Sequence, residues 1–247
     1  MTRPADLLGF VFDSKPHRLS GDLLRRMESS PRFTAFVETY REKIRKKIRV
    51  ARDSESALDL RSELEVASCL LQDRRLAVAY EPYASAKRRG PDFGVAYRVN
   101  TVFNIEVARM RAGEGEPGGS DPPGPGPRRR EERVVRILLA KLGQMQPGMA
   151  NLLVIHTREE LAKSIDLGET MRALKLRVEG KDPVFFAASG YASPAAFYKD
   201  FLHLSGILFW VPGALPWANR QARPLLDEKV LRLVSSLAGA GSAIEKL

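Results

Sequence analysis

The stretch Pro91–Met110, PDFGVAYRVNTVFNIEVARM, decides how this chain is expected to fold. Large apolar residues alternate with small or polar ones on both sides of a short break, a pattern typical of two strands that each bury one face. A slip of one residue would turn every side chain to the wrong face, so the two apolar rows fix the pairing of the strands. The pattern predicts a hairpin with Phe93 opposite Ile105, and with Val95 opposite Phe103.

The same register places two carboxylates side by side on the other face of the hairpin. Asp92 lies opposite Glu106, and the Cβ atoms of a directly opposed pair are roughly 5 Å apart. Like charges at this distance repel each other, and a divalent cation bound to both carboxylates would relieve the repulsion. Two carboxylates that share a proton, or that stand at a solvent-exposed edge, are the alternative interpretation.

The segments around the hairpin predict a mixed sheet flanked by helices, an α/β arrangement. Residues 54–73 and 128–142 have the spacing of amphipathic helices, and residues 76–85, 151–156 and 206–211 have the pattern of strands. We also expect helices over residues 20–50, over 158–175 and over 197–202, with Pro31 either interrupting the first or starting a second helix. A last helix is expected from about residue 225.

These elements divide the chain into three parts. Residues 1–53 are interpreted as an N-terminal helical extension, 54–211 as the α/β core, and 212–247 as a C-terminal helical tail. Within the core, Ala112–Pro127 holds six glycines and five prolines in sixteen positions, which predicts a flexible inserted loop.

Composition narrows the classes of function. The 247 residues include 40 lysines and arginines against 30 aspartates and glutamates, a formal net charge of +10 that favours a polyanionic partner such as nucleic acid. One cysteine excludes an intrachain disulfide, and three dispersed histidines argue against a zinc site. No GxxxxGK[ST] loop is present. Short and interrupted apolar stretches predict a cytoplasmic protein without a membrane partner.

The proline–aspartate pair that ends in Asp92, followed by Glu106 on the next strand, resembles the motif of the PD-(D/E)xK nucleases. The resemblance covers roughly Ser54–Val211 and implies a restriction-endonuclease-like core. It also implies that Asp92 and Glu106 bind Mg²⁺ or Mn²⁺, assisted by an acidic residue of the preceding helix. Glu63 is the candidate for that residue, with Glu65 as the alternative.

One position departs from the family pattern. The family's lysine stands two residues after the second acid, where this chain has Ala108, and strand alternation turns Arg109 to the opposite face. Lys141 shares helical spacing with apolar residues of 128–142 and is the predicted substitute, with Lys87 as a second candidate.

The resemblance therefore implies metal-dependent hydrolysis of phosphodiester bonds in nucleic acid, with DNA favoured over RNA. A catalytically inactive module of the same fold, which binds nucleic acid or a protein partner, is the alternative. Basic residues are expected to bind the phosphate backbone without reading bases, although such runs often only face solvent. The candidates are Arg45, Lys46, Arg49, Lys87, Arg88 and Arg133.

Overall fold

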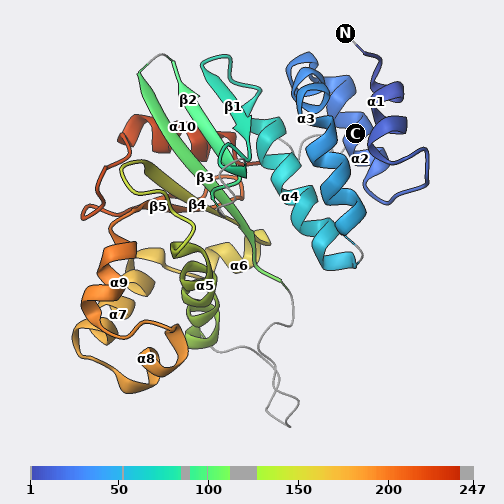
Figure 1. Ribbon diagram of the computed structural model, residues 1–247. Coiled ribbons are helices and arrows are strands. Elements are labelled where there is room, and N and C mark those ends of the chain that lie inside the picture. Colours follow the sequence, from blue (N-terminus) through green and yellow to red (C-terminus); the bar gives the residue numbers. More distant parts are fainter. Residues whose placement is uncertain (1, 52, 85–89, 99, 112–126, 240–247) are drawn as a thin grey trace.

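A six-stranded mixed sheet forms the centre of the computed structural model, which describes residues 2–51, 53–84, 90–98, 100–111 and 127–239 (Figure 1). The strands lie in the order in which they occur in the sequence. They are β1 (Leu76–Tyr80), β2 (Phe93–Tyr97), β3 (Thr101–Arg109), β4 (Ala150–His156), β5 (Leu204–Phe209) and β6 (Trp217–Ala218). The expected mixed α/β class is confirmed.

The strand directions change along the sheet. β1, β2 and β3 are antiparallel, β3, β4 and β5 are parallel, and the short β6 is antiparallel to β5. Phe93 pairs with Ile105 and Val95 with Phe103, so the predicted hairpin register is confirmed. Parallel neighbours need a crossover connection, and the helix α5 (Pro127–Leu142) lies in the connection between β3 and β4.

Helices cover both faces of the sheet (Figure 1). One face is packed by the N-terminal helices and the last helix, and the other by the helices that follow β3. The first group is α1 (Pro4–Val11), α2 (Ser20–Ser29), α3 (Pro31–Val50), α4 (Ser54–Leu70) and α10 (Glu228–Leu237). The second is α5, α6 (Glu159–Lys163), α7 (Leu167–Glu179), α8 (Pro183–Ser189) and α9 (Pro194–Phe201).

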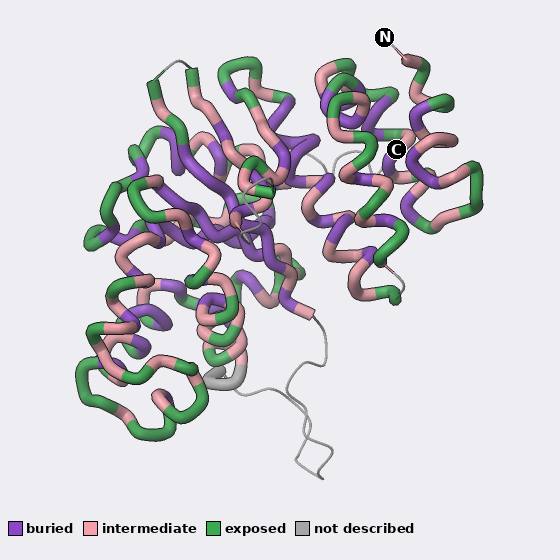
Figure 2. Tube along the Cα trace, in the orientation of Figure 1, coloured by how far each residue is buried: buried purple, intermediate pink, exposed green. Residues whose placement is uncertain are grey.

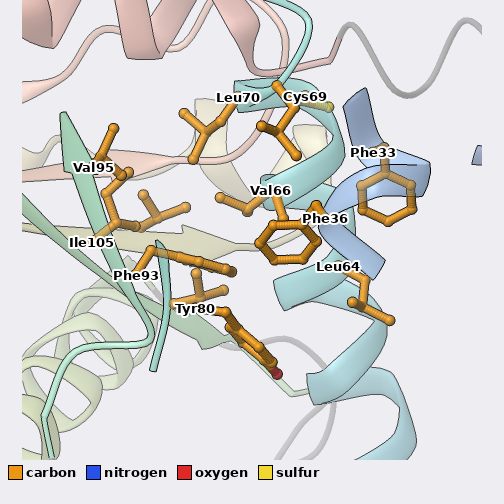
Figure 3. Close-up of a cluster of buried hydrophobic side chains, with 14 of the residues drawn as sticks. Phe33, Phe36, Leu64, Val66, Cys69, Leu70, Tyr80, Phe93, Val95 and Ile105 are labelled. Carbon is orange, nitrogen blue, oxygen red and sulfur yellow. The ribbon is translucent and has the colours of Figure 1, made fainter. Parts of the chain in front are cut away.

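The alternation of side chains along the central strands produces two hydrophobic cores. On β3, Phe103 and Ile105 point to the α4 side, whereas Ala108 lies on the α5 side. The purple central strands in Figure 2 are buried on both faces. Figure 3 shows the first core between the sheet and helices α3 and α4, where Phe36 and Val66 pack towards Phe93.

The N-terminal helices share the first core with the sheet. Phe33 and Ile44 of α3 are buried in the same cluster as Phe93 and Leu152 of the strands. Pro31 starts a second helix instead of bending one long helix, because the Ser30 side chain accepts a hydrogen bond from the Phe33 N–H and caps α3. Residues 1–53 are thus continuous with the core and bring α3 against α4.

Three local expectations need correction. The helix expected over 158–175 is two helices, because Asp166 caps a new helix by accepting from the Glu169 N–H. The short helices α1 and α8 were not predicted. Pro127, placed at the end of the flexible loop by its composition, instead begins α5, while residues 112–126 lie outside the described part of the chain.

Candidate active site

The hairpin brings Asp92 and Glu106 together, as its register predicts. Asp92 lies directly before β2, and its Oδ2 accepts a hydrogen bond from the Val107 N–H of β3 at 2.8 Å. Glu106 is on the α5 side of β3 and only 1% exposed. The two carboxyl groups are close enough that the charge of Glu106 contributes to raising the pKa of Asp92.

Helix α5 supplies a lysine to the acidic pair, where β3 carries Ala108 instead of a lysine. Val134, Leu138 and Leu142 of α5 are buried against the sheet, and this packing brings the adjacent Lys141 over β3. The Lys141 ammonium contacts Glu106 Oε1 at 2.5 Å. Lys141 therefore reaches the acidic pair from another element, as the sequence predicted, while Ala108 provides no charge there.

Helix α4 contributes Glu63 to the same place. Its Oε2 accepts hydrogen bonds from the Tyr80 hydroxyl and the Lys47 ammonium, each at 2.6 Å. In Figure 3 the Tyr80 ring belongs to the first core and its hydroxyl oxygen lies at the edge of that core. The polar site thus begins where the apolar packing between α4 and the sheet ends.

Lys47 of α3 is the site residue that sequence reasoning missed. Its Nζ lies 2.6 Å from Glu63 Oε2, 3.0 Å from Glu81 Oε1 and 3.9 Å from Asp92 Oδ1. A signal was present, because Lys47 borders the buried stripe formed by Ile44 and Ile48 on α3. Within a run of seven basic residues that signal could not be separated from its solvent-facing neighbours.

Negative charge exceeds positive charge at this site. Four carboxylates (Glu63, Glu81, Asp92 and Glu106) face two ammonium groups, Lys47 and Lys141. Burial, and then the charge of Glu106, raise the pKa of Asp92 to about 7. Burial, and then the charge of Asp92, raise the pKa of Glu63 to about 7. Burial also raises the pKa of Glu106, against the effect of Lys141.

This arrangement fits a divalent cation. Carboxylate oxygens are the ligands that Mg²⁺ and Mn²⁺ prefer, and the buried Glu106 Oε2 has no hydrogen-bond partner among the described residues. A cation would supply that partner and balance the excess charge. In the described residues, no three His, Cys, Asp or Glu side chains are already grouped to bind an ion. The carboxylates are instead arranged around the ammonium groups of Lys47 and Lys141.

A cavity of about 510 Å³ lies between α3 and α4, on the Glu63 side of the site. Lys47 and Glu63 form part of its wall, so solvent reaches them from this side. The remaining lining residues are Lys43, Lys46, Val50, Ala51, Ser56, Asp59, Leu60, Glu81 and Ala84.

The alternative acidic residue of α4, Glu65, lies elsewhere. Its Oε1 is 3.2 Å from His156 Nε2, and its Oε2 accepts from Arg26 Nη2 at 3.2 Å. Arg109, on the opposite face of β3 from Ala108, forms an ion pair with Asp59 of α4 at 3.0 Å. Both positions agree with the strand and helix periodicity.

The basic residues predicted to bind nucleic acid have different surroundings. Arg45 and Arg49 both bind the Asp13 carboxylate through their Nε atoms, at 2.7 Å and 2.8 Å. Lys46 is exposed on α3, and Arg133 lies on α5. The two basic residues at positions 87 and 88 lie outside the described residues. The prediction of Lys87 as a catalytic residue therefore also falls outside them.

Comparison of the chain with protein-family models, with curated proteins and with solved structures finds no match. No helix among the described residues is long and apolar enough to cross a membrane. Functional inference therefore depends on the chemistry of the site itself.

Proposed function

We propose that this chain is a metal-dependent nuclease of the PD-(D/E)xK type, which hydrolyses phosphodiester bonds in nucleic acid, DNA ahead of RNA. The observation that carries the proposal is that Lys141, from a separate helix, contacts Glu106, whose charge acts on Asp92, as that of Asp92 acts on Glu63. The order of α4, three strands, α5 and β4 supports a restriction-endonuclease-like core.

Each residue has a defined part in this proposal. Asp92 and Glu106, with Glu63, would hold Mg²⁺ or Mn²⁺, which when bound lowers the pKa of a coordinated water and neutralises charge on the phosphate. The Val107 N–H fixes the orientation of Asp92. The Lys141 ammonium, held by Glu106, would orient the attacking water and stabilise negative charge that develops on the phosphate.

Direct assay tests the proposal. The full chain is incubated with supercoiled DNA, linear duplex, single-stranded DNA and RNA, each with Mg²⁺, Mn²⁺ or a chelator. We expect cleavage that requires the metal and that Asp92→Asn abolishes. Asp73→Asn is the matched control, because Asp73 forms an ion pair with Arg75 outside the site. Absence of cleavage with every substrate and metal would refute the nuclease.

Lys47 favours a second candidate, the catalytically inactive module. Its ammonium already lies among Glu63, Glu81 and Asp92, so it occupies the place of a metal ion and would repel one. Thermal unfolding with and without Mn²⁺ separates the two, because a ligand that binds only the folded state raises the melting temperature. If the chain is a nuclease, Mn²⁺ raises the melting temperature of the wild-type protein. If the chain is the inactive module, Mn²⁺ raises the melting temperature only of the Lys47→Met variant, which lacks the competing ammonium group.

A further inference from the structure

A second concentration of positive charge lies along α5, away from the carboxylates. A pocket of about 190 Å³ forms between the end of β3 and α5. Its lining residues in the described part of the chain include three arginines and no acidic side chain: Met110, Arg111, Arg133, Arg136, Ile137 and Ala140. Arg111 is paired with Asp59 and Glu55 of α4, which do not line the pocket, so Arg133 and Arg136 supply the positive charge that favours an anionic ligand.

The guanidinium of Arg133 is incompletely paired. Its Nη2 atom is buried and has no hydrogen-bond partner among the described residues. A buried donor without an acceptor lowers stability, so such a group calls for a ligand that brings an oxygen. Arg136, one turn away, is exposed and forms no ion pair within the described part of the chain.

The third arginine is held in place from outside the pocket. Asp59 of α4 binds Arg111 Nη2 at 2.6 Å, which limits the positions that this guanidinium can take. A guanidinium presents several N–H donors in a planar fork that suits phosphate oxygens. Arg133 and Arg136 therefore offer the donors that match a phosphate group, and Arg111, held by Asp59, lies beside them.

The pocket also has a defined relation to the candidate active site. Arg133, Ile137 and Lys141 are spaced four residues apart on α5, so they share one face of the helix. Eight residues of helix span about 12 Å. Successive nucleotides of a strand in duplex DNA rise about 3.4 Å along the axis, so this separation corresponds to about three or four base pairs. The pocket volume, about 190 Å³, is below that of typical ligand sites, which suits a phosphate better than a base.

We propose that Arg111, Arg133 and Arg136 form a phosphate-binding site for the nucleic-acid strand whose scissile bond lies at Glu106 and Lys141. The inference rests on the proposed function and specifies where the backbone binds. Of the segments predicted from the sequence to bind the backbone, it favours α5, which carries Arg133, over α3, where Arg45 and Arg49 are occupied by Asp13. The bound phosphate is either an internal diester or the monoester at a strand end.

Binding measured without cleavage tests this site. The probe is a fluorescein-labelled 16-nucleotide DNA strand in chelator, titrated by fluorescence anisotropy at several salt concentrations. We expect Arg133→Gln to weaken binding about tenfold and to reduce the slope of log K against log salt by about 0.7, because the variant neutralises one phosphate fewer on a single strand. Arg136→Gln, at an exposed position, should act in the same direction with its melting temperature unchanged.

Arg172→Gln is the matched control, because Arg172 is exposed on α7 and pairs with Glu169. Strands with a 5′-phosphate, a 3′-phosphate or free hydroxyl ends distinguish the two phosphate sources. If the site binds a terminal phosphate, the wild type binds the strand with one of the two phosphorylated ends more tightly, and Arg133→Gln loses that preference. If the site binds an internal phosphate, Arg133→Gln lowers the affinity for all three strands by the same factor.

The inference and the proposed function fail in different ways. If the wild type binds and cleaves while both variants keep its affinity and salt slope, the phosphate site is overturned and the nuclease stands. If the wild type cleaves nothing but Arg133→Gln weakens binding as expected, the nuclease fails and the phosphate site stands. A wild type that binds no strand overturns the phosphate site.

Discussion

Glu63 and Glu65 are two residues apart on α4, and both are withdrawn from solvent, yet their surroundings differ in charge. Burial raises the pKa of Glu63 to about 7, and the neighbouring Asp92 adds to this effect despite Lys47. Burial would also raise the pKa of Glu65, but the hydrogen bond with His156 and the positive charges of Arg26 and Arg61 lower it below its usual value.

The difference separates a carboxylate kept for the fold from one available for chemistry. Glu65 ties α4 to α2 through Arg26, which is 3% exposed, and to the end of β4 through His156. Glu63 belongs to a group in which carboxylates outnumber ammonium groups and which includes Asp92. Strongly shifted pKa values of this kind cluster at functional sites, because a structural pair is balanced by its own partners.

The largest expected effect is on the unbalanced side, at Lys141. In the proposed nuclease, Lys141→Met should reduce cleavage about 1,000-fold, because it would remove a charge that stabilises the transition state. Affinity for a DNA strand should stay within about twofold, since the residue acts on the reaction and not on uniform binding. Cleavage kinetics measure the first effect, and fluorescence anisotropy measures the affinity. Lys163→Met, at an exposed i,i+4 pair with Glu159, is the control. Normal cleavage by Lys141→Met would remove this lysine from the mechanism.

The next effect is on the balanced side and concerns stability. Glu65→Gln should lower the free energy of unfolding by about 3 kcal/mol, because it leaves the buried Arg26 with a neutral partner in place of a charged one. Asp22 still binds Arg26, which keeps the loss at the lower end of the usual range. Glu63→Gln, the matched change, should cost less or add stability. Urea denaturation of both variants decides, and equal losses would show that the two carboxylates are equally structural.

The sequence predicted the hairpin and the position of Lys141 because each depends on a strict period. Residues 93–97 and 101–109 alternate clearly, so only one register buries both apolar rows. Lys141 follows the buried Leu138 by three residues and the buried Val134 by seven, so its side chain leaves the same face of the helix. The choice of Glu63 over Glu65 could not be settled by period alone, because each lies within a turn of buried residues of α4.

Residues brought in from distant segments were harder to predict. Lys47 reaches Asp92 because α3 packs on α4, and nothing local in the basic run marks that proximity. Arg45 and Arg49 bind Asp13, which lies 32 and 36 residues away and has a positive φ of 53°. Such an ion pair depends on how distant segments of the chain pack together, and the periodicity of the sequence carries no information about that packing.

A smaller effect follows from pH. Glu63 and Asp92 have raised pKa values in the folded state, so the folded chain binds more protons than the unfolded chain between about pH 4 and pH 7. Their contribution therefore raises the free energy of unfolding as the pH falls from about 8 to about 5. Glu63→Gln resembles the protonated form, so the variant should show about 2 kcal/mol less of this rise. Denaturant titrations at about pH 5.5, 7 and 8.5 measure it, and an identical slope in the variant would place Glu63 in a balanced environment like that of Glu65.

The smallest expected effect is at α3, one of the segments where the sequence predicts binding of the phosphate backbone. Arg49 donates to Asp13 Oδ2 from Nε at 2.8 Å and to Oδ1 from Nη2 at 2.9 Å, so its donors face a carboxylate. A phosphate would have to displace that partner and would meet the negative charge of Asp13. Arg49→Gln should therefore keep its affinity for a DNA strand within about twofold of the wild type, and its salt slope within about 0.2. A residue that neutralises one phosphate of a single strand accounts for about 0.7 of that slope. If Arg49→Gln lowers the slope by that full amount while Arg133→Gln leaves it unchanged, backbone binding returns to α3.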